Sequence, residues 1–112
     1  MKPLFLPGRA QVLRKATRMN KQPFVSKAQL DEIIEHYPTP FHLYDEAGIR
    51  RNMEAVRDAF AWNPGFKEYF AVKATPNPFL INILRDYGCG CDCSSATELQ
   101  LCDAMGISGH DI

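Results

Sequence analysis

Two consecutive strand-then-helix segments in the second half of the chain constrain its fold more than any other feature. Residues 69–74 carry aromatic and β-branched side chains, residues 89–94 alternate cysteine with other residues, and both segments predict strands. Residues 77–88 predict a helix with an Asn-Pro start and a Gly end, whose buried side would hold Leu80, Ile83, Leu84 and Tyr87. Residues 95–106 predict a second helix that also ends at Gly and would turn Leu99, Cys102 and Met105 inward. Strands that alternate with helices through short loops indicate an α/β fold with a parallel sheet covered by helices.

The sequence is too short to complete such a fold. It has 112 residues, whereas a complete (β/α)₈ barrel of the TIM type needs about 250. Two parallel strands cannot close a barrel, and residues 107–112 would begin a further crossover where the sequence stops. We therefore expect the N-terminal portion of a (β/α)₈ TIM-type barrel, incomplete as given.

A basic leader of residues 1–25 opens the chain. Six basic residues lie in the leader and a seventh, Lys27, also precedes the first acidic residue, Asp31, although the whole chain balances 13 basic against 13 acidic residues. Such a leader could bind nucleic acid or direct the chain to an organelle, but it has few hydroxyl residues and only residues 4–6 as an apolar core. We interpret it as a disordered tail, with Met19 as an alternative start, and expect no nucleic-acid partner.

An initial helix and strand are predicted over residues 26–45. Ser26 and Gln29 form a capping box before a short amphipathic helix that should end near His36. Residues 41–44 have strand propensity, and Asp45 can cap the helix predicted over residues 46–61. Residues 46–112 would then form the first part of the barrel.

Four cysteines fall within fourteen residues near the end of the chain: Cys89, Cys91, Cys93 and Cys102. A zinc site favours paired C-x-x-C spacing and nearby histidine, neither of which occurs here. We interpret the cysteines as small buried hydrophobic residues, expect no metal, and expect a reducing, cytoplasmic compartment. No apolar run approaches the ~20 residues that span a bilayer, so we expect no membrane association. The three histidines, His36, His42 and His110, show no partner spacing and are interpreted as non-catalytic.

Lys73 is the first candidate for chemistry. Read with period two, Tyr69, Ala71 and Lys73 share one face of the predicted strand, opposite Phe70 and Val72. An amine at the carboxyl end of a parallel strand, where barrel active sites are built, can form a Schiff base if a partly desolvated pocket lowers its pKa. The alternative is a solvated lysine that ends a strand.

Four motifs occur in order along residues 39–112. They are Thr-Pro-Phe-His-Leu-Tyr-Asp at 39–45, Tyr-Phe-Ala-Val-Lys-Ala at 69–74, Gly-Cys-Asp-Cys-Ser-Ser at 90–95 and Glu-Leu at 98–99. With these motifs the chain resembles the fold-type III pyridoxal-phosphate decarboxylases, which share their barrel with alanine racemase. Among them it is most similar to the diaminopimelate decarboxylases. The resemblance implies an alanine-racemase-like barrel and pyridoxal 5′-phosphate as cofactor.

The resemblance also implies roles for single residues. Lys73 matches the lysine that forms the Schiff base with the cofactor and would be catalytic. Ala71 matches the small residue beside the cofactor ring, and Asp92 matches an acid at a strand end near the lysine. Asp92 is equally explained as an acid near a helix start. Glu98 matches a family glutamate, but its capping box with Ser95 explains it without a cofactor.

The function implied is the decarboxylation of a diamino acid, with meso-diaminopimelate giving L-lysine in lysine biosynthesis. The substrate is a small amino acid, and family members form homodimers. An ornithine, arginine or carboxynorspermidine decarboxylase is the alternative within the enzymes. A truncated, non-catalytic homologue that binds a partner is the alternative outside them. We expect these 112 residues alone to be inactive, because the family's phosphate- and substrate-binding residues come later in the chain.

Overall fold

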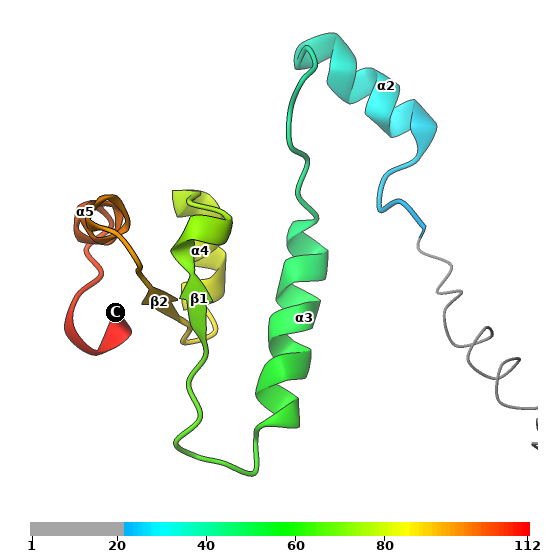
Figure 1. The fold of residues 1–112 in the computed structure, drawn as a ribbon. Coiled ribbons are helices and arrows are strands. Elements are labelled where there is room, and N and C mark those ends of the chain that lie inside the picture. Colours follow the sequence, from blue (N-terminus) through cyan, green and yellow to red (C-terminus); the bar gives the residue numbers. More distant parts are fainter. Residues whose placement is uncertain (1–21) are drawn as a thin grey trace, which may run out of the picture. The chain divides into compact units, whose positions relative to one another are not determined.

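The computed structural model describes residues 22–112 (Figure 1). The leader, whose disorder we expected, lies outside the described residues except for residues 22–25, and Met19, the alternative start, also lies outside them. The chain divides into two units, one that runs to His42 and one that spans Leu43–Ile112, and each is described by itself.

The first unit contains helix α2, Lys27–His36. The predicted capping box is confirmed. The Ser26 backbone N–H donates to Gln29 Oε1 at 2.8 Å, and the Gln29 backbone N–H donates to Ser26 Oγ at 3.3 Å. The prediction of a strand at residues 41–44 is wrong, because these residues have no regular secondary structure. The two-stranded sheet that the structure describes does not include them.

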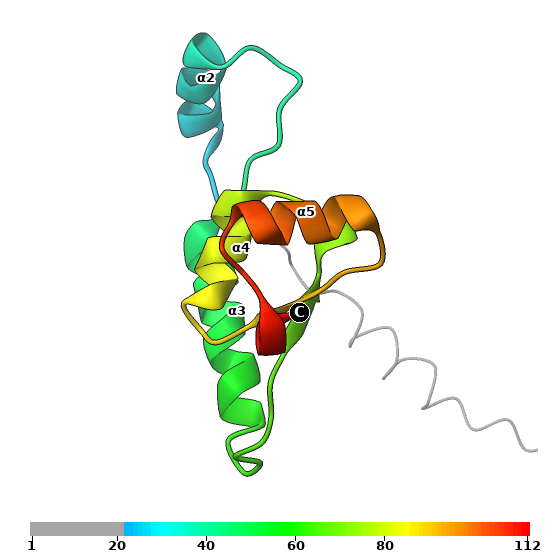
Figure 2. The ribbon, with the colours of Figure 1, turned by 90° about the vertical axis from the view of Figure 1, so that its left-hand side faces the viewer.

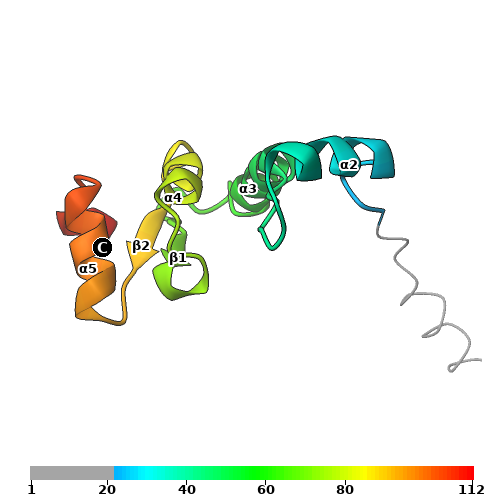
Figure 3. The ribbon, with the colours of Figure 1, turned by 90° about the horizontal axis from the view of Figure 1, so that it is seen from above.

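The second unit begins with helix α3, Glu46–Ala59, which Asp45 caps as predicted. Its Oδ1 accepts a hydrogen bond of 2.9 Å from the Gly48 backbone N–H. The half-buried side of α3 carries Ile49, Met53 and Val56 and packs beside α4 (Figure 3). Ile49, Met53 and Val56 confirm the predicted apolar face. Phe60, which the helical period also places on that face, is the C-cap residue beyond the helix and is 40 % exposed.

A two-stranded parallel sheet forms the centre of the second unit. Strand β1, Tyr69–Ala71, pairs with β2, Gly90–Asp92, and the register sets Tyr69 beside Gly90 and Ala71 beside Asp92. The parallel pairing is confirmed, but each strand has three residues instead of the six predicted. The sheet ends where the paired residues end, and the backbone then turns into other structure.

Helices α4, Pro78–Arg85, and α5, Ala96–Ala104, follow the two strands (Figure 2). The predicted caps are confirmed at Asn77 and Ser95, and Gly88 and Gly106 have φ values of 80° and 67°, which favour glycine at helix ends. Residues 107–112 contain the short 3₁₀ turn η2, Gly109–Asp111, which lies beside β2.

The core lies between the sheet and its helices and consists of Val72, Ile81, Cys91, Cys102 and Ile107. The sequence pattern had placed Leu80, Ile83, Leu84 and Tyr87 on the buried side of α4 and did not include Ile81, which is 1 % exposed. Leu99 was predicted to face inward on α5, and this is wrong, because its side chain is 48 % exposed. None of the helices in residues 22–112 has the length and apolar content that a membrane crossing requires.

Candidate active site

Lys73 does not lie in a strand as predicted. It is the middle residue of the 3₁₀ turn η1, Val72–Ala74, in which the Thr75 backbone N–H donates to the Val72 carbonyl at 3.1 Å. The turn satisfies backbone groups that β2 cannot pair, because the register ends at Ala71 and Asp92. Val72 is fully buried and Lys73 is exposed. The Val72 side chain therefore packs the turn against the core, and the Lys73 side chain lies in solvent.

The structure brings together the three residues that the sequence singled out. Ala71 is the last residue of β1, and its partner in register is Asp92, the last residue of β2. Lys73 follows two residues after Ala71, so all three lie at the carboxyl end of the parallel pair. Ala71 is half-buried, whereas Asp92 is exposed.

The Lys73 amine is available for chemistry within the described part of the chain. No hydrogen bond or salt bridge from residues 22–112 engages it, in contrast to Lys67, which forms a salt bridge with Asp111. Its positive charge acts on Glu98 and helps to lower the pKa of that carboxyl group. A lysine without a fixed partner can bond to a carbonyl group once its ammonium group loses its proton. Lys73 is exposed among the described residues, so these residues do not form the partly desolvated pocket that would favour that loss.

Glu98 is held by the two serines that precede its helix. Its Oε2 accepts from the Ser94 backbone N–H at 2.8 Å, and its Oε1 accepts from the Ser95 hydroxyl at 2.9 Å. The Glu98 backbone N–H in turn donates to Ser95 Oγ at 3.3 Å. The bond from the Ser94 backbone is the largest cause of the lowered pKa of Glu98, the serine hydroxyls and Lys73 act in the same direction, and partial desolvation opposes them.

Ser94 is a site residue that the sequence reasoning missed. A capping box predicts that the glutamate side chain reaches back to the backbone of the N-cap, Ser95. Instead it reaches one residue further, to Ser94. The adjacent Ser-Ser pair before a glutamate was the available signal, because either serine could serve as the partner of the carboxylate.

The cysteines are all free, and their predicted role in packing is confirmed. Cys89, Cys91 and Cys102 are at most 5 % exposed, and Cys93 is half-buried. Desolvation raises the pKa of each thiol. None of these groups is activated as a nucleophile by its surroundings.

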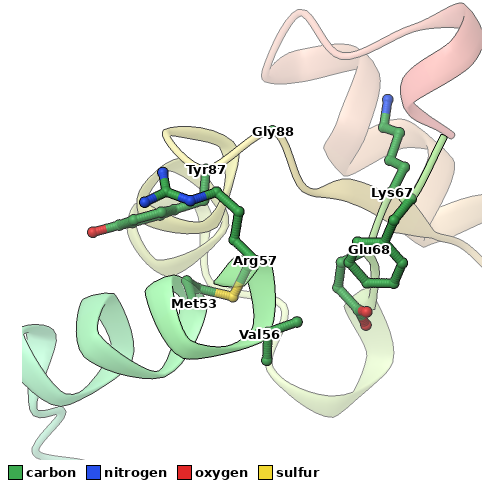
Figure 4. Close-up of a pocket in the computed structure, with 8 residues that line it drawn as sticks. Met53, Val56, Arg57, Lys67, Glu68, Tyr87 and Gly88 are labelled. Atoms are coloured by element: carbon green, nitrogen blue, oxygen red, sulfur yellow. The ribbon is translucent and has the colours of Figure 1, made fainter. Parts of the chain in front are cut away.

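Figure 4 shows a pocket at the opposite, amino end of β1. It is lined by residues of α3, of the segment before β1 and of the segment after α4: Met53, Val56, Arg57, Phe66, Lys67, Glu68, Tyr87 and Gly88. The Arg57 guanidinium lies over the ring of Tyr87, 6.0 Å from its centroid. The volume is about 70 Å³, well below the roughly 300 Å³ at which ligand pockets begin. The pocket lies at the other end of β1 from Lys73 and contains none of the residues of the candidate site.

The fold and the site define an α/β domain with parallel strands and an exposed lysine just beyond the carboxyl end of the first. Residues 46–112 match the pyridoxal binding domain of the pyridoxal-dependent decarboxylases, and the chain belongs to this family. Its cofactor is pyridoxal phosphate.

Curated relatives of the chain include three bacterial proteins. Protein TabA of Pseudomonas amygdali pv. tabaci is 48 % identical over 83 residues, which cover 74 % of this chain and 20 % of TabA. The diaminopimelate decarboxylase of Aquifex aeolicus is 36 % identical over 84 residues, 75 % of this chain and 19 % of the relative. That of Bacteroides thetaiotaomicron is 34 % identical over 74 residues, 66 % of this chain and 19 % of the relative.

The chain thus spans about a fifth of the length of the curated relatives that it matches. No solved structure matches it.

Proposed function

We propose that this chain supplies the lysine-bearing part of the cofactor site in a longer pyridoxal-phosphate-dependent decarboxylase, and that the substrate is meso-diaminopimelate. The observation that carries the proposal is the position of Lys73, exposed and without a fixed partner, next to the paired strand ends at Ala71 and Asp92. The diaminopimelate decarboxylases among the relatives support the choice of substrate.

The residues near Lys73 fit a flat, charged cofactor. Pyridoxal phosphate needs a primary amine to bind its aldehyde carbon, and Lys73 offers one to solvent. A ring that lies against the strand end needs a small side chain there, and Ala71 adds only a methyl group. Glu98 lies within electrostatic reach of Lys73, and Asp92 adds a second carboxylate at the paired strand end.

Each residue would then have its own role. Lys73 would hold the cofactor through its amine, and Ala71 would leave room for the ring. Asp92 and the ionised Glu98 would place negative charge near the Lys73 amine and would balance its positive charge whenever the nitrogen is released and protonated. The bound cofactor supplies an electron sink that stabilises the carbanion left when the α-carboxylate departs as carbon dioxide.

The complete protein would form an alanine-racemase-like (β/α)₈ barrel and a homodimer. The two parallel strands with their connecting helix α4 are the repeating unit of such a barrel. A two-stranded sheet leaves edges unpaired, and further parallel strands would cover them.

Amino acids other than meso-diaminopimelate are alternative substrates for the longer protein. One relative, from Niallia circulans, is named L-glutamyl-[BtrI acyl-carrier protein] decarboxylase and is 31 % identical over 88 residues. Similarity in this part of the chain therefore accompanies more than one substrate, and ornithine, arginine and carboxynorspermidine are alternatives for this protein.

Release of carbon dioxide tests the proposal. We expect a protein that carries this chain at the length of its relatives to decarboxylate meso-diaminopimelate with a higher kcat/KM than ornithine, arginine or carboxynorspermidine. A preference for one of the other amino acids would overturn the choice of substrate. Release from none of them, with pyridoxal phosphate bound, would favour the non-catalytic, partner-binding alternative.

A further inference from the structure

Two cysteines lie in sulfur–sulfur contact beside the candidate site. The Sγ atoms of Cys93 and Cys102 are 3.5 Å apart. Cys93 follows β2 directly and is half-buried, whereas Cys102 lies in α5 and has no exposed surface. The contact therefore joins one thiol that a small reagent can reach to one that is shielded from it.

The separation suits a covalent bond. A disulfide bond is about 2.05 Å long, so the two sulfur atoms need to approach by about 1.5 Å. Cys93 lies in the loop between β2 and Ser95, the N-cap of α5, and its backbone is held neither in the sheet nor in the helix. The accessible thiol is therefore also the one whose backbone is free to adjust.

The other two cysteines are less suited to this chemistry. Cys91 is 1 % exposed, and although it also lies close to Cys102, no reagent in solvent can reach it first. The Cys89 thiol is 5 % exposed and donates to the Gly90 carbonyl at 3.4 Å. Residues 22–112 contain no group of three or more His, Cys, Asp or Glu side chains arranged to hold a metal ion.

We propose that Cys93 and Cys102 form a reversible disulfide in the folded chain when a small-molecule disulfide such as oxidised glutathione is present. The Cys93 sulfur, after losing its proton, attacks one glutathione sulfur, and the S–S bond of glutathione breaks to release one reduced glutathione. Cys102, after losing its proton, then attacks the Cys93 sulfur and releases the second. The two thiols are oxidised by two electrons, the glutathione disulfide is reduced to two thiols, and the two protons pass to the released glutathione.

The position of the disulfide gives it a consequence for the site. Cys93 lies between Asp92, the register partner of Ala71, and Ser94, whose backbone N–H binds Glu98. The bond would tie this loop to α5 at a second point, in addition to the contact between Ser94 and Glu98. The disulfide would therefore lie one residue from Asp92 and one residue from Ser94.

Peptide mapping tests the proposal on the full 112-residue chain. The reduced chain is exposed to oxidised glutathione at alkaline pH under native conditions, because the Cys93 thiol loses its proton only there. The remaining thiols are alkylated, and the digested peptides are identified by mass spectrometry. We expect the Cys93–Cys102 cross-link to exceed any other pairing by about tenfold or more, because contact raises the effective concentration of the two thiols. Dithiothreitol should restore both thiols, and oxidation in urea should give mixed pairings.

Variants separate this pair from the rest. Cys93→Ser and Cys102→Ala should each abolish the cross-link, whereas Cys89→Ala should retain it, with circular dichroism to confirm that each variant keeps its helices. The unmodified chain decides the question even if a variant fails to fold. A native chain that pairs Cys89 or Cys91 as often as Cys93 and Cys102, stays reduced, or stops at a glutathione adduct on Cys93 would overturn the proposal.

Discussion

The backbone N–H of Ser94 donates a hydrogen bond of 2.8 Å to Glu98 Oε2. This bond joins the loop after β2 to the first turn of α5, and the Ser95 hydroxyl holds the second carboxylate oxygen of Glu98. One acidic side chain thus organises the segment that follows Asp92, and the charge of Lys73 acts on it. The consequences of this arrangement can be measured one residue at a time.

Loss of the N-cap hydroxyl should loosen the start of α5. Ser95→Ala removes the acceptor of the Glu98 backbone N–H and one donor to its carboxylate. The typical cost of losing such a cap is about 1 kcal/mol, so we expect the amide of Glu98 to exchange with solvent about fivefold faster. Hydrogen exchange followed by NMR measures this rate directly.

Thr97→Ala provides the matched control. Thr97 is exposed within the same turn of α5 and makes none of the hydrogen bonds described for Ser94 and Ser95. Because alanine favours the helix more than threonine does, its replacement should not accelerate the exchange of the Glu98 amide. Equal acceleration in both variants would mean that loss of the Ser95 cap does not account for the effect.

The carboxyl group of Glu98 should titrate below its ordinary pKa of 4.5. A carboxylate whose pKa is lowered by folding stabilises the folded state above the unfolded pKa, and the contribution is lost as the pH falls through the folded pKa. The start of α5 should therefore stay protected from neutral pH down past 4.5 and loosen only in more acidic solution. An NMR titration of the Glu98 side chain that gives a pKa at or above 4.5 would contradict the described contacts.

Gly90 should not tolerate a side chain. A Cβ atom at this position would lie 2.6 Å from Cδ1 of Tyr69 and 3.1 Å from the backbone oxygen of Asp111. Gly90→Ala should displace the Tyr69 ring and break its hydrogen bond of 2.8 Å to the His110 carbonyl. We expect the free energy of unfolding, measured in urea, to fall by roughly 1–3 kcal/mol.

Gly65→Ala is the control for that substitution. A Cβ atom at Gly65 would meet only Asn63 Oδ1, at 3.5 Å, which is an ordinary contact. Its effect on the free energy of unfolding should be much smaller. Similar losses in the two variants would mean that the clash with the Tyr69 ring does not account for the effect at Gly90.

Local signals in the sequence predicted much of this fold. The caps at Ser26, Asp45, Asn77 and Ser95 were found because each needs only a side chain and a backbone N–H two or three residues away. The lengths of the strands were not predicted, because they depend on how many residues of β1 find a partner in β2. The prediction of a strand at residues 41–44 was wrong for the same reason, because residues with strand propensity form no strand unless another strand pairs with them.

The candidate site was predicted in its members but not in its geometry. Ala71, Lys73 and Asp92 do lie together, because the carboxyl ends of parallel strands meet at one edge of the sheet. Periodicity placed Lys73 on a strand face, and it could not anticipate the 3₁₀ turn that begins at the fully buried Val72. The role of Ser94 was missed because it depends on a side chain that reaches back four residues.

The Cys93 thiol should react with alkylating reagents only in alkaline solution. Desolvation raises its pKa to about 11, and the neighbouring Cys102, Glu98 and Asp92 act in the same direction. The thiolate is the reactive form, so the rate with iodoacetamide should keep rising with pH beyond the range in which an ordinary thiol, with a pKa near 8.5, has levelled off. A rate that becomes constant near pH 9 would contradict the described surroundings of Cys93.

The most direct test of the central claim is the identity of the lysine that carries the cofactor. The protein with this chain at the length of its relatives is loaded with pyridoxal phosphate, reduced with borohydride to fix the cofactor on its lysine, and mapped by mass spectrometry. We predict the label on Lys73, its loss in Lys73→Ala, and its retention in the matched variant Lys67→Ala, because Lys67 is engaged by Asp111 at the other end of β1. A label on another lysine, or one that persists in Lys73→Ala, would contradict the account.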